Sequence, residues 1–324
     1  MILMNLFFIS TLLLSLILGK NNMGNLFGTA LVGKMVSFKT AVLMGALGVA
    51  AGVFFGSADT VKAVVSLGNL HTQSNLLVVN LAAALALVIM TCRGIPVSIT
   101  QTIMGALIAL LLFNGLELNT KTLTEMLCGW VYSPLVAAII SCLLFLMIRF
   151  LLRHFPVHLL YRDAYLRIGL VLLGTFLGYA LGANNVSVIV GPVLSVSSVP
   201  RAEVLIFVIL FIALGFFTAN PKVINTLGKS MFPLTPTESF ISVLSAALAL
   251  LAFSSPVISF LPPVPVPMIC VMVGAIIGIA IGKGAFATLK LSIAGKLISA
   301  WVVTPVFAGL ICFCFLSIYK IWGK

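Results

Sequence analysis

One long stretch without charges limits what this chain can fold into. Between Arg167 and Arg201 no charged residue occurs. The interval exceeds the roughly 20 residues that one helix needs to cross a bilayer, yet it is too short for two crossings. One full span followed by a half-helix fits it. The same stretch holds the polar residues 182–187, which include Asn184 and Asn185. Because hydrocarbon does not tolerate unpartnered polar groups, we expect these residues to face a cavity inside the protein.

Composition places the chain in the lipid bilayer. Hydrophobic residues make up 62% and charged residues only 7%, whereas about a quarter of the residues of a soluble domain are charged. The formal charge of +12 would suit nucleic acid, but the basic residues stand between apolar spans and form no basic face interleaved with aromatic rings. The six cysteines lack the C-x-x-C spacing of a metal site. We predict a polytopic membrane protein without a nucleic-acid partner, metal or cofactor.

The chain is internally duplicated. The separation between matching segments grows from 163 to 171 residues along the chain, so small insertions accumulate while the order is kept. Three segments of the first half recur in the second: Gly19–Thr29 as Gly182–Pro192, Gly94–Val97 as Pro263–Val266, and Trp130–Pro134 as Trp301–Pro305. Two homologous halves follow from this pattern.

An odd number of spans in each half would place the second half upside down in the membrane. Charge-free segments predict about five spans per half. The expected fold is therefore an all-α membrane protein of two inverted repeats, 1–148 and 164–324, each with a re-entrant or broken half-helix. The connector 149–163 holds the densest basic cluster. Because loops rich in Lys and Arg stay in the cytoplasm, we expect a cytoplasmic connector and a multi-pass protein of the inner (plasma) membrane.

The duplicated Gly-x-Asn-Asn motif predicts an anion site. A half-helix that begins there presents unpaired amide N–H groups and the positive end of its dipole, which favour an anion. Two inverted copies would aim two such ends at one point near the membrane midplane. An alternative is that the small and amide residues merely permit close helix packing. The candidate substrate-binding residues of the two copies are Asn21, Asn22, Gly24, Asn25, Asn184, Asn185 and Ser187.

Four further residues are candidates for the same site. Lys20 stands inside the first copy, where it would balance a divalent anion or else extend to the membrane interface. Ser98, Thr100 and Gln101 follow the Gly-Ile-Pro-Val turn. They would complete the site or serve as helix caps.

Acidic residues near the predicted spans are candidates for proton coupling, because an ionisable group at membrane depth is commonly functional. Glu238 is the first choice and Asp59 the second. The alternatives are that Glu238 is an N-terminal helix charge at the interface and that Asp59 pairs with Lys62 at a loop edge.

These segments together resemble the inorganic phosphate transporter (PiT) family. Gly182–Gly191 is similar to the family signature G-A-N-D-V-A-N-A-x-G, which occurs once in each inverted half, and Gly19–Gly28 matches it more loosely. Gly94–Ser98 resembles the family's G-x-P-V-S-T-T-H, Leu234–Pro236 its L-T-P and Trp301–Pro305 its W-V-x-S/T-P. The resemblance covers almost the whole chain and implies a symporter for a tetrahedral oxyanion.

The chain departs from this family where the chemistry is concentrated. The signature aspartate is Asn22 in one copy and Asn185 in the other, and Gln101 and Cys270 stand at the histidine positions. In phosphate carriers the resemblance implies that the two carboxylates bind sodium or accept a proton from phosphate. Asparagine offers one carbonyl oxygen and an NH₂ donor instead. This pattern resembles the sulfate-permease branch, and Lys20 would strengthen a preference for a dianion. We therefore expect sulfate uptake driven by H⁺, with Na⁺ less favoured.

Other functions stay open on the sequence. Phosphate, coupled to protons or sodium, is the nearest alternative substrate. An anion channel would line a pore with the same half-helices but could not concentrate its substrate. No motif pairs a nucleophile with a base, so we do not expect an enzyme. A homodimer is the candidate assembly.

Overall fold

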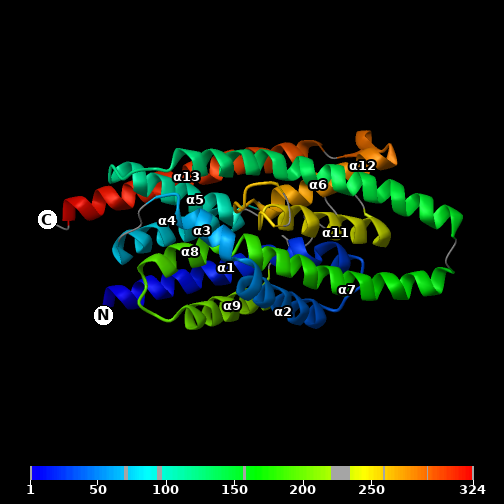
Figure 1. Ribbon diagram of the computed structural model, residues 1–324, viewed down its shortest axis with the longest axis horizontal. Coiled ribbons are helices and arrows are strands. Elements are labelled where there is room, and N and C mark those ends of the chain that lie inside the picture. Colours follow the sequence, from blue (N-terminus) through cyan, green and yellow to red (C-terminus); the bar gives the residue numbers. More distant parts are fainter. Residues whose placement is uncertain are drawn as a thin grey trace.

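The computed structural model describes residues 2–68, 72–92, 97–155, 158–219, 234–257, 260–289 and 291–322, and these are almost entirely helical (Figure 1). The first half supplies α1 (Ile2–Val32), α2 (Phe38–Gly56), α3 (Ala58–Val65), α4 (Gln73–Cys92), α5 (Ile99–Phe113) and α6 (Thr120–His154). The second half supplies α7 (Leu159–Asn184), α8 (Ser187–Val196), α9 (Arg201–Phe217), α11 (Pro236–Ala252), α12 (Met268–Lys283), the short 3₁₀ helix η2 (Phe286–Thr288) and α13 (Leu291–Trp322).

The two halves are inverted copies of one helix order. Helix α2 begins 163 residues before α9, and α4 begins 163 residues before α11. Figure 1 shows α1 and α6 running away from the end that carries both termini, while α7 and α13 run back toward it. The predicted all-α fold of two inverted repeats is confirmed. Of the predicted motif residues, Gly94, Ile95 and Pro96 lie outside the described residues.

Short helices are present, but the asparagine motif predicted a break in both copies and only the second copy has one. In the first copy α1 runs unbroken through Asn21 and Asn22, so the predicted break there is wrong. In the second copy α7 ends at Asn184 and α8 begins at Ser187, as expected. The short helices common to both halves are α5 and α12, with 15 and 16 residues. At about 1.5 Å per residue each is shorter than the roughly 30 Å hydrocarbon core.

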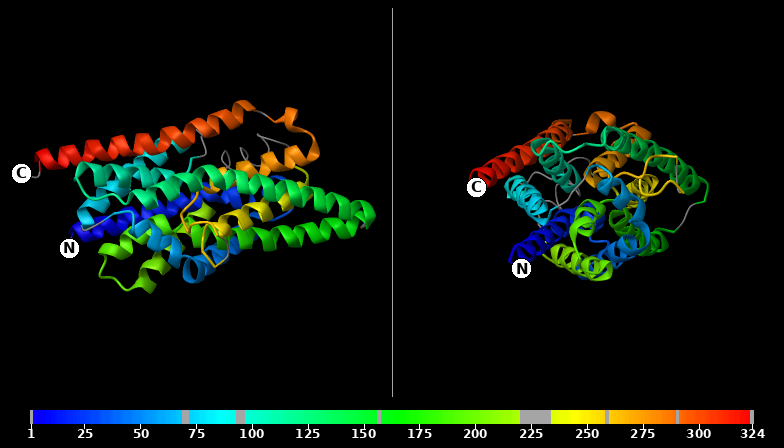
Figure 2. Two further views of the ribbon diagram at one scale, coloured as in Figure 1. Left: turned by 45° about the horizontal axis from the view of Figure 1, so that its top comes forward. Right: turned by 60° about the vertical axis from the view of Figure 1, so that its left-hand side comes forward.

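The packing joins the halves to each other. Helix α2 packs on α7 and its counterpart α9 on α1, while α6 packs on α12 and its counterpart α13 on α5. Small residues permit this approach: a Cβ added at Gly105 of α5 would collide with the carbonyl oxygen of Pro305 in α13, and one at Gly274 of α12 with that of Pro134 in α6. Figure 2 shows the helices of both halves gathered into one bundle. The two sequence repeats are therefore not two packing units.

The outer surface of the bundle is apolar. Six helices of the described chain are long and apolar enough to cross a membrane, while α5, α11 and α12 are shorter apolar helices. Large hydrophobic side chains stay exposed along α6 and α13, as a lipid-facing surface requires. They include Val131, Leu135 and Ile139 on one helix and Val306 and Leu310 on the other. The predicted connector 149–163 is largely helical, because α6 extends to His154 and α7 begins at Leu159.

Candidate functional site

A small polar cavity lies at the meeting point of both repeats. Its volume is about 10 Å³, the room that one water molecule occupies. The polar residues around it come from α1, from the start of α5 and from the break between α7 and α8. The lining residues are Leu18, Asn21, Asn22, Asn25, Val97, Ser98, Ile99, Thr100, Asn185, Met268 and Ile269. A tetrahedral oxyanion is larger than a water molecule, so the cavity is too small for one in this conformation.

Backbone carbonyls fix the orientation of the cavity amides. Asn21 Nδ2 donates to the Val97 oxygen at 2.7 Å, and Asn185 Nδ2 donates to the Val266 oxygen at 2.6 Å. Turning either amide over would set two acceptor oxygens against each other, so the nitrogen must face the carbonyl. Asn185 also donates to Thr100 Oγ1 at 2.8 Å. The NH₂ groups are therefore used inside the protein.

The oxygens of the same amides stay free. Oδ1 of Asn21, Asn25 and Asn185 is buried without a hydrogen-bond partner among the described residues. Asn22 differs, because its Oδ1 accepts from Asn25 Nδ2 at 2.7 Å and its own Nδ2 donates to Leu18 O at 3.0 Å. We expected the asparagines to offer donors to an anion. In this conformation their NH₂ groups bond within the protein instead, and the unpaired oxygens are buried acceptors.

Helix N-termini supply the positive side of the cavity. Helix α5 begins at Ile99 with Ser98 as its N-cap, and α12 begins at Met268 after Pro267. Residues from both starts line the cavity. The first N–H groups of a helix are unpaired within it and carry its positive dipole end. The starts of two inverted helices thus meet at the cavity, and these helices are α5 and α12, neither of which follows an asparagine motif.

Asn184 and Ser187 hold the structure beside the cavity instead of lining it. Asn184 is fully buried and donates from Nδ2 to the carbonyl oxygens of Phe253 and Val264 at 2.9 and 3.0 Å. Its Oδ1 accepts from Val266 N at 2.8 Å. Ser187 donates to the Asn184 carbonyl oxygen at 2.6 Å. Asn184 therefore fixes the segment that precedes α12 against the break between α7 and α8.

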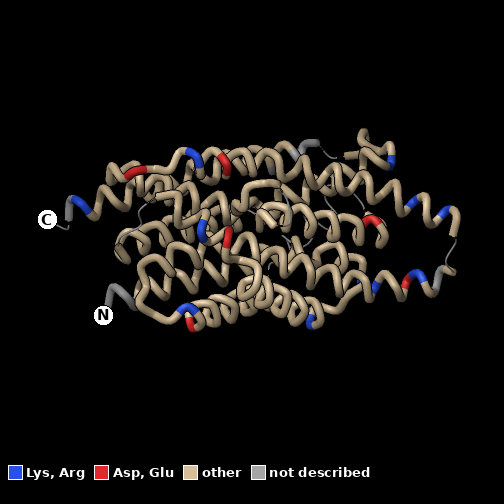
Figure 3. The backbone as a smooth tube through the Cα atoms, viewed as in Figure 1, with Lys and Arg blue, Asp and Glu red and all other residues tan. Residues whose placement is uncertain are grey.

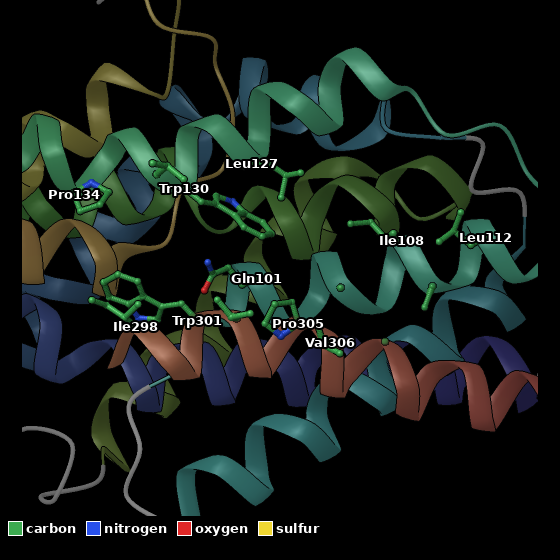
Figure 4. Close-up of a pocket in the computed structure, with 15 residues that line it drawn as sticks. Gln101, Ile108, Leu112, Leu127, Trp130, Pro134, Ile298, Trp301, Pro305 and Val306 are labelled. Carbon is green, nitrogen blue, oxygen red and sulfur yellow. The ribbon is translucent and has the colours of Figure 1, made fainter. Parts of the chain in front are cut away.

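Gln101 faces a different pocket. This apolar pocket of about 740 Å³ lies between α5, α6 and α13, and Gln101 stands in it between Trp130 and Trp301 (Figure 4). The Gln101 backbone N–H donates to Ser98 Oγ at 3.2 Å, and its side-chain Oε1 is buried without a partner in the described chain. Gln101 therefore lines the apolar pocket and not the polar cavity.

The remaining candidates lie away from the polar cavity. Lys20 is partly buried on α1 and Gly24 is buried, and neither lines it. Glu238 accepts from the N–H of Thr235 at 2.8 Å in a capping box at the start of α11 and pairs with Lys283 at 2.7 Å. Asp59 pairs with Lys62 at 3.5 Å. All six acidic residues of the chain lie in its described part, and none lines the cavity.

Sequence reasoning did not name the contribution of α12. Met268 and Ile269 line the cavity, and the carbonyl oxygens of Val97 and Val266 hold its amides. The signal was available, because Val97 and Val266 occupy the same place in the duplicated Pro-Val segments. Backbone acceptors leave no other trace in a sequence.

A family profile matches nearly the whole chain. Residues 18–312 fit the description "Phosphate transporter family", and the matched range includes both asparagine motifs and the starts of α5 and α12. The chain belongs to the phosphate transporter family. Its resemblance to this family, read from the twin signatures, is confirmed, and the family and the fold are those of a membrane transporter.

Curated members of the phosphate transporter family are similar over most of their length. A Methanocaldococcus jannaschii protein named "Putative phosphate permease" is 26% identical over 311 residues, which cover 95% of each chain. A sulfate permease of Bacillus subtilis is 27% identical over 305 residues, which cover 92% of this chain and 82% of that protein. A solved structure, "The sodium-dependent phosphate transporter", is 20% identical with a TM-score of 0.82 and covers 99% of this chain and 100% of its own. This likeness shows the fold.

Proposed function

We propose that the chain is a secondary transporter for a tetrahedral inorganic oxyanion, with sulfate as its preferred substrate and protons as the driving ion. The observation that carries this proposal is the polar cavity at which the N-termini of α5 and α12 meet. Positive dipole ends and hydroxyl groups suit an anion at membrane depth. The cavity is too small for the anion in this conformation, which fits a carrier that closes and opens around its site.

Sulfate is proposed because no carboxylate lines the cavity. The signature positions hold Asn22 and Asn185, and all six acidic residues lie elsewhere in the described structure. A carboxylate would repel a dianion, and unit charges about 4 Å apart interact by roughly 4 kcal/mol near a protein surface. Neutral amides remove that repulsion. The similar Bacillus subtilis protein is a sulfate permease.

Phosphate is a second candidate, and a specific observation favours it. The free Oδ1 atoms of Asn21, Asn25 and Asn185 are acceptors. A P–OH group of dihydrogen or monohydrogen phosphate would donate to them, whereas sulfate is fully deprotonated at neutral pH. The similar Methanocaldococcus jannaschii protein carries the phosphate-permease name. For sulfate, water molecules or rotated amides would have to satisfy these oxygens.

Proton coupling is proposed because the cavity offers sodium no anionic ligand. Neutral amide oxygens coordinate a hard cation more weakly than carboxylates do. Glu238 and Asp59 remain the candidates for a titrating group, although both are engaged outside the cavity. A coupling role for either would therefore have to act at a distance from the substrate.

The test is uptake of radiolabelled sulfate into proteoliposomes with an inward proton gradient, with and without sodium and with excess phosphate. Accumulation of labelled sulfate that requires the proton gradient, does not depend on sodium and is not inhibited by phosphate supports the whole proposal. Complete block by phosphate would transfer the assignment to the second candidate. Label that only equilibrates, whatever the gradient, would indicate a channel.

Variants locate the site. Asn22→Ala and Asn185→Ala should each abolish uptake while the protein is still produced, because both residues line the cavity. Asn80→Ala is the matched control: Asn80 is a buried amide on α4 that donates to Ser10 and Thr11. It does not line the cavity and should retain uptake per molecule. Normal uptake by the Asn22 and Asn185 variants would remove the central site.

A further inference from the structure

We propose that a pocket at the end of the bundle where α6 meets α7 binds the phosphate headgroup of an anionic phospholipid. This arginine pocket, of about 280 Å³, lies between α6, α7 and α11. Arg149 and Arg153 line it from α6 and Arg162 from α7. The proposal does not depend on which oxyanion the transporter carries.

The three arginines line one pocket from two helices. Arg149 and Arg153 are four residues apart, so they stand one above the other on the same face of α6. Arg162 Nη2 donates to Thr237 Oγ1 on α11 at 2.8 Å, which holds the third guanidinium at the pocket wall. Arginine binds phosphate through two parallel N–H groups and is the usual residue for such recognition.

The carboxylates nearest these arginines are paired with other basic residues. Of the six acidic residues in the sequence, only Glu238 lines the pocket. Its carboxylate is 2.7 Å from Lys283, and Asp163 on α7 is 2.7 Å from Arg167, so both are already paired. Figure 3 shows that basic residues outnumber acidic ones at this end of the molecule. The charge balance therefore calls for an anion from outside the chain.

The pocket lies at the depth of a lipid headgroup. Residues 126–148 of α6 carry no charge and span about 34 Å of helix, close to the roughly 30 Å hydrocarbon core. Arg149 is therefore the first charge on leaving the core at this end. Anionic lipid headgroups attract basic protein segments at this depth, and basic pockets between membrane helices bind such headgroups.

Apolar side chains make a lipid a better occupant than a free ion. Phe145 lines the pocket about one turn closer to the membrane centre than Arg149, Ile148 directly precedes Arg149, and Ile241 lines the pocket from α11. A phosphodiester held by the arginines would leave its acyl chains against this apolar wall and against the exposed face of α6. Inorganic phosphate would use the arginines alone.

The experiment measures lipid retention by the full chain purified in detergent. Phosphatidylglycerol and phosphatidylcholine are added to delipidated protein, and bound lipid is counted by native mass spectrometry. Arg149→Gln with Arg153→Gln removes two charges from the pocket. Lys121→Gln with Arg201→Gln removes two charges from exposed positions that do not line it.

Wild-type protein should retain phosphatidylglycerol over phosphatidylcholine. The double arginine variant should lose affinity for phosphatidylglycerol by about 30-fold, taking roughly a fivefold effect for each basic residue at a membrane surface. The control should be unchanged. Equal retention by the arginine variant and wild type would overturn the proposal. Displacement of phosphatidylglycerol by excess inorganic phosphate would show a free-anion site and overturn the lipid assignment. Sulfate uptake is measured for the same arginine variant. Because the arginine pocket is not the polar cavity, loss of lipid binding and loss of transport can be told apart.

Discussion

Replacing Asn184 by alanine should unfold the site without removing a substrate ligand. Its amide makes three hydrogen bonds, to Phe253 O, Val264 O and Val266 N. Measured side-chain hydrogen bonds inside membrane proteins average about 0.6 kcal/mol and reach about 1.7 kcal/mol. Three such bonds predict a loss of about 2 to 5 kcal/mol. The loss should be near the upper end, because the residue is fully buried and water cannot replace the amide.

The assay is thermal unfolding in detergent beside uptake in proteoliposomes. A loss of about 1 kcal/mol lowers Tm by roughly 2–4 °C in chains of 150–250 residues, so a fall of several degrees is expected. Ser187→Ala is the control, because Ser187 makes a single bond within its own turn, to Asn184 O. It should cost less than about 1 kcal/mol. Wild-type Tm in Asn184→Ala, combined with lost uptake, would refute the reasoning and return Asn184 to the substrate ligands.

Three further perturbations follow from the packing and the charges. Gly105→Ala should destabilise the protein by about 1–3 kcal/mol, because the new Cβ collides with the backbone of α13. Gly295→Ala, also in a helix, meets nothing within 4 Å among the described residues and should not lower Tm. Lys283→Met removes the ion-pair partner of Glu238, whose side chain is 6% exposed, and should cost about 1–3 kcal/mol. Lys62→Met, which breaks an exposed pair, should have almost no effect in the same melting assay. Asn185→Asp should reduce sulfate uptake by about 100-fold or more through repulsion of a dianion, and undiminished uptake would place the anion elsewhere.

The repeat architecture was predictable because recognisable segments of the first half recur in the second half. The twin Asn-Asn motifs, the Pro-Val turns and the Trp-to-Pro segments keep their order, and the helices that contain them keep it too. Inversion then followed from an odd number of spans. That only the second asparagine motif interrupts its helix could not be predicted, because the two motifs differ little in sequence. The equivalent residues Asn22 and Asn185 differ in their partners: Asn22 bonds to Leu18 one turn back on its own helix, whereas Asn185 bonds to Val266, far along the chain.

The site was predictable in its residues but less so in its chemistry. Asn21, Asn22, Asn25, Thr100 and Asn185 do line one cavity. Which end of each amide faces that cavity depends on backbone carbonyls supplied by other segments, and no pattern of side chains records them. The same limit explains Gln101, which neighbours Thr100 in sequence but faces the apolar pocket.

The exchange of partners between the repeats affects how the chain is made. A ribosome delivers α1 and α2 to the membrane well before α9 and α7, the helices on which they pack. The same holds for α5 and α6, whose partners α13 and α12 come last. Grooves such as the one at Gly105, which receives Pro305, stay open until synthesis is nearly complete. The helices of the first half are thus inserted before their packing partners are made. Their packing surfaces must be covered by the insertion machinery or by lipid until the last helix is inserted.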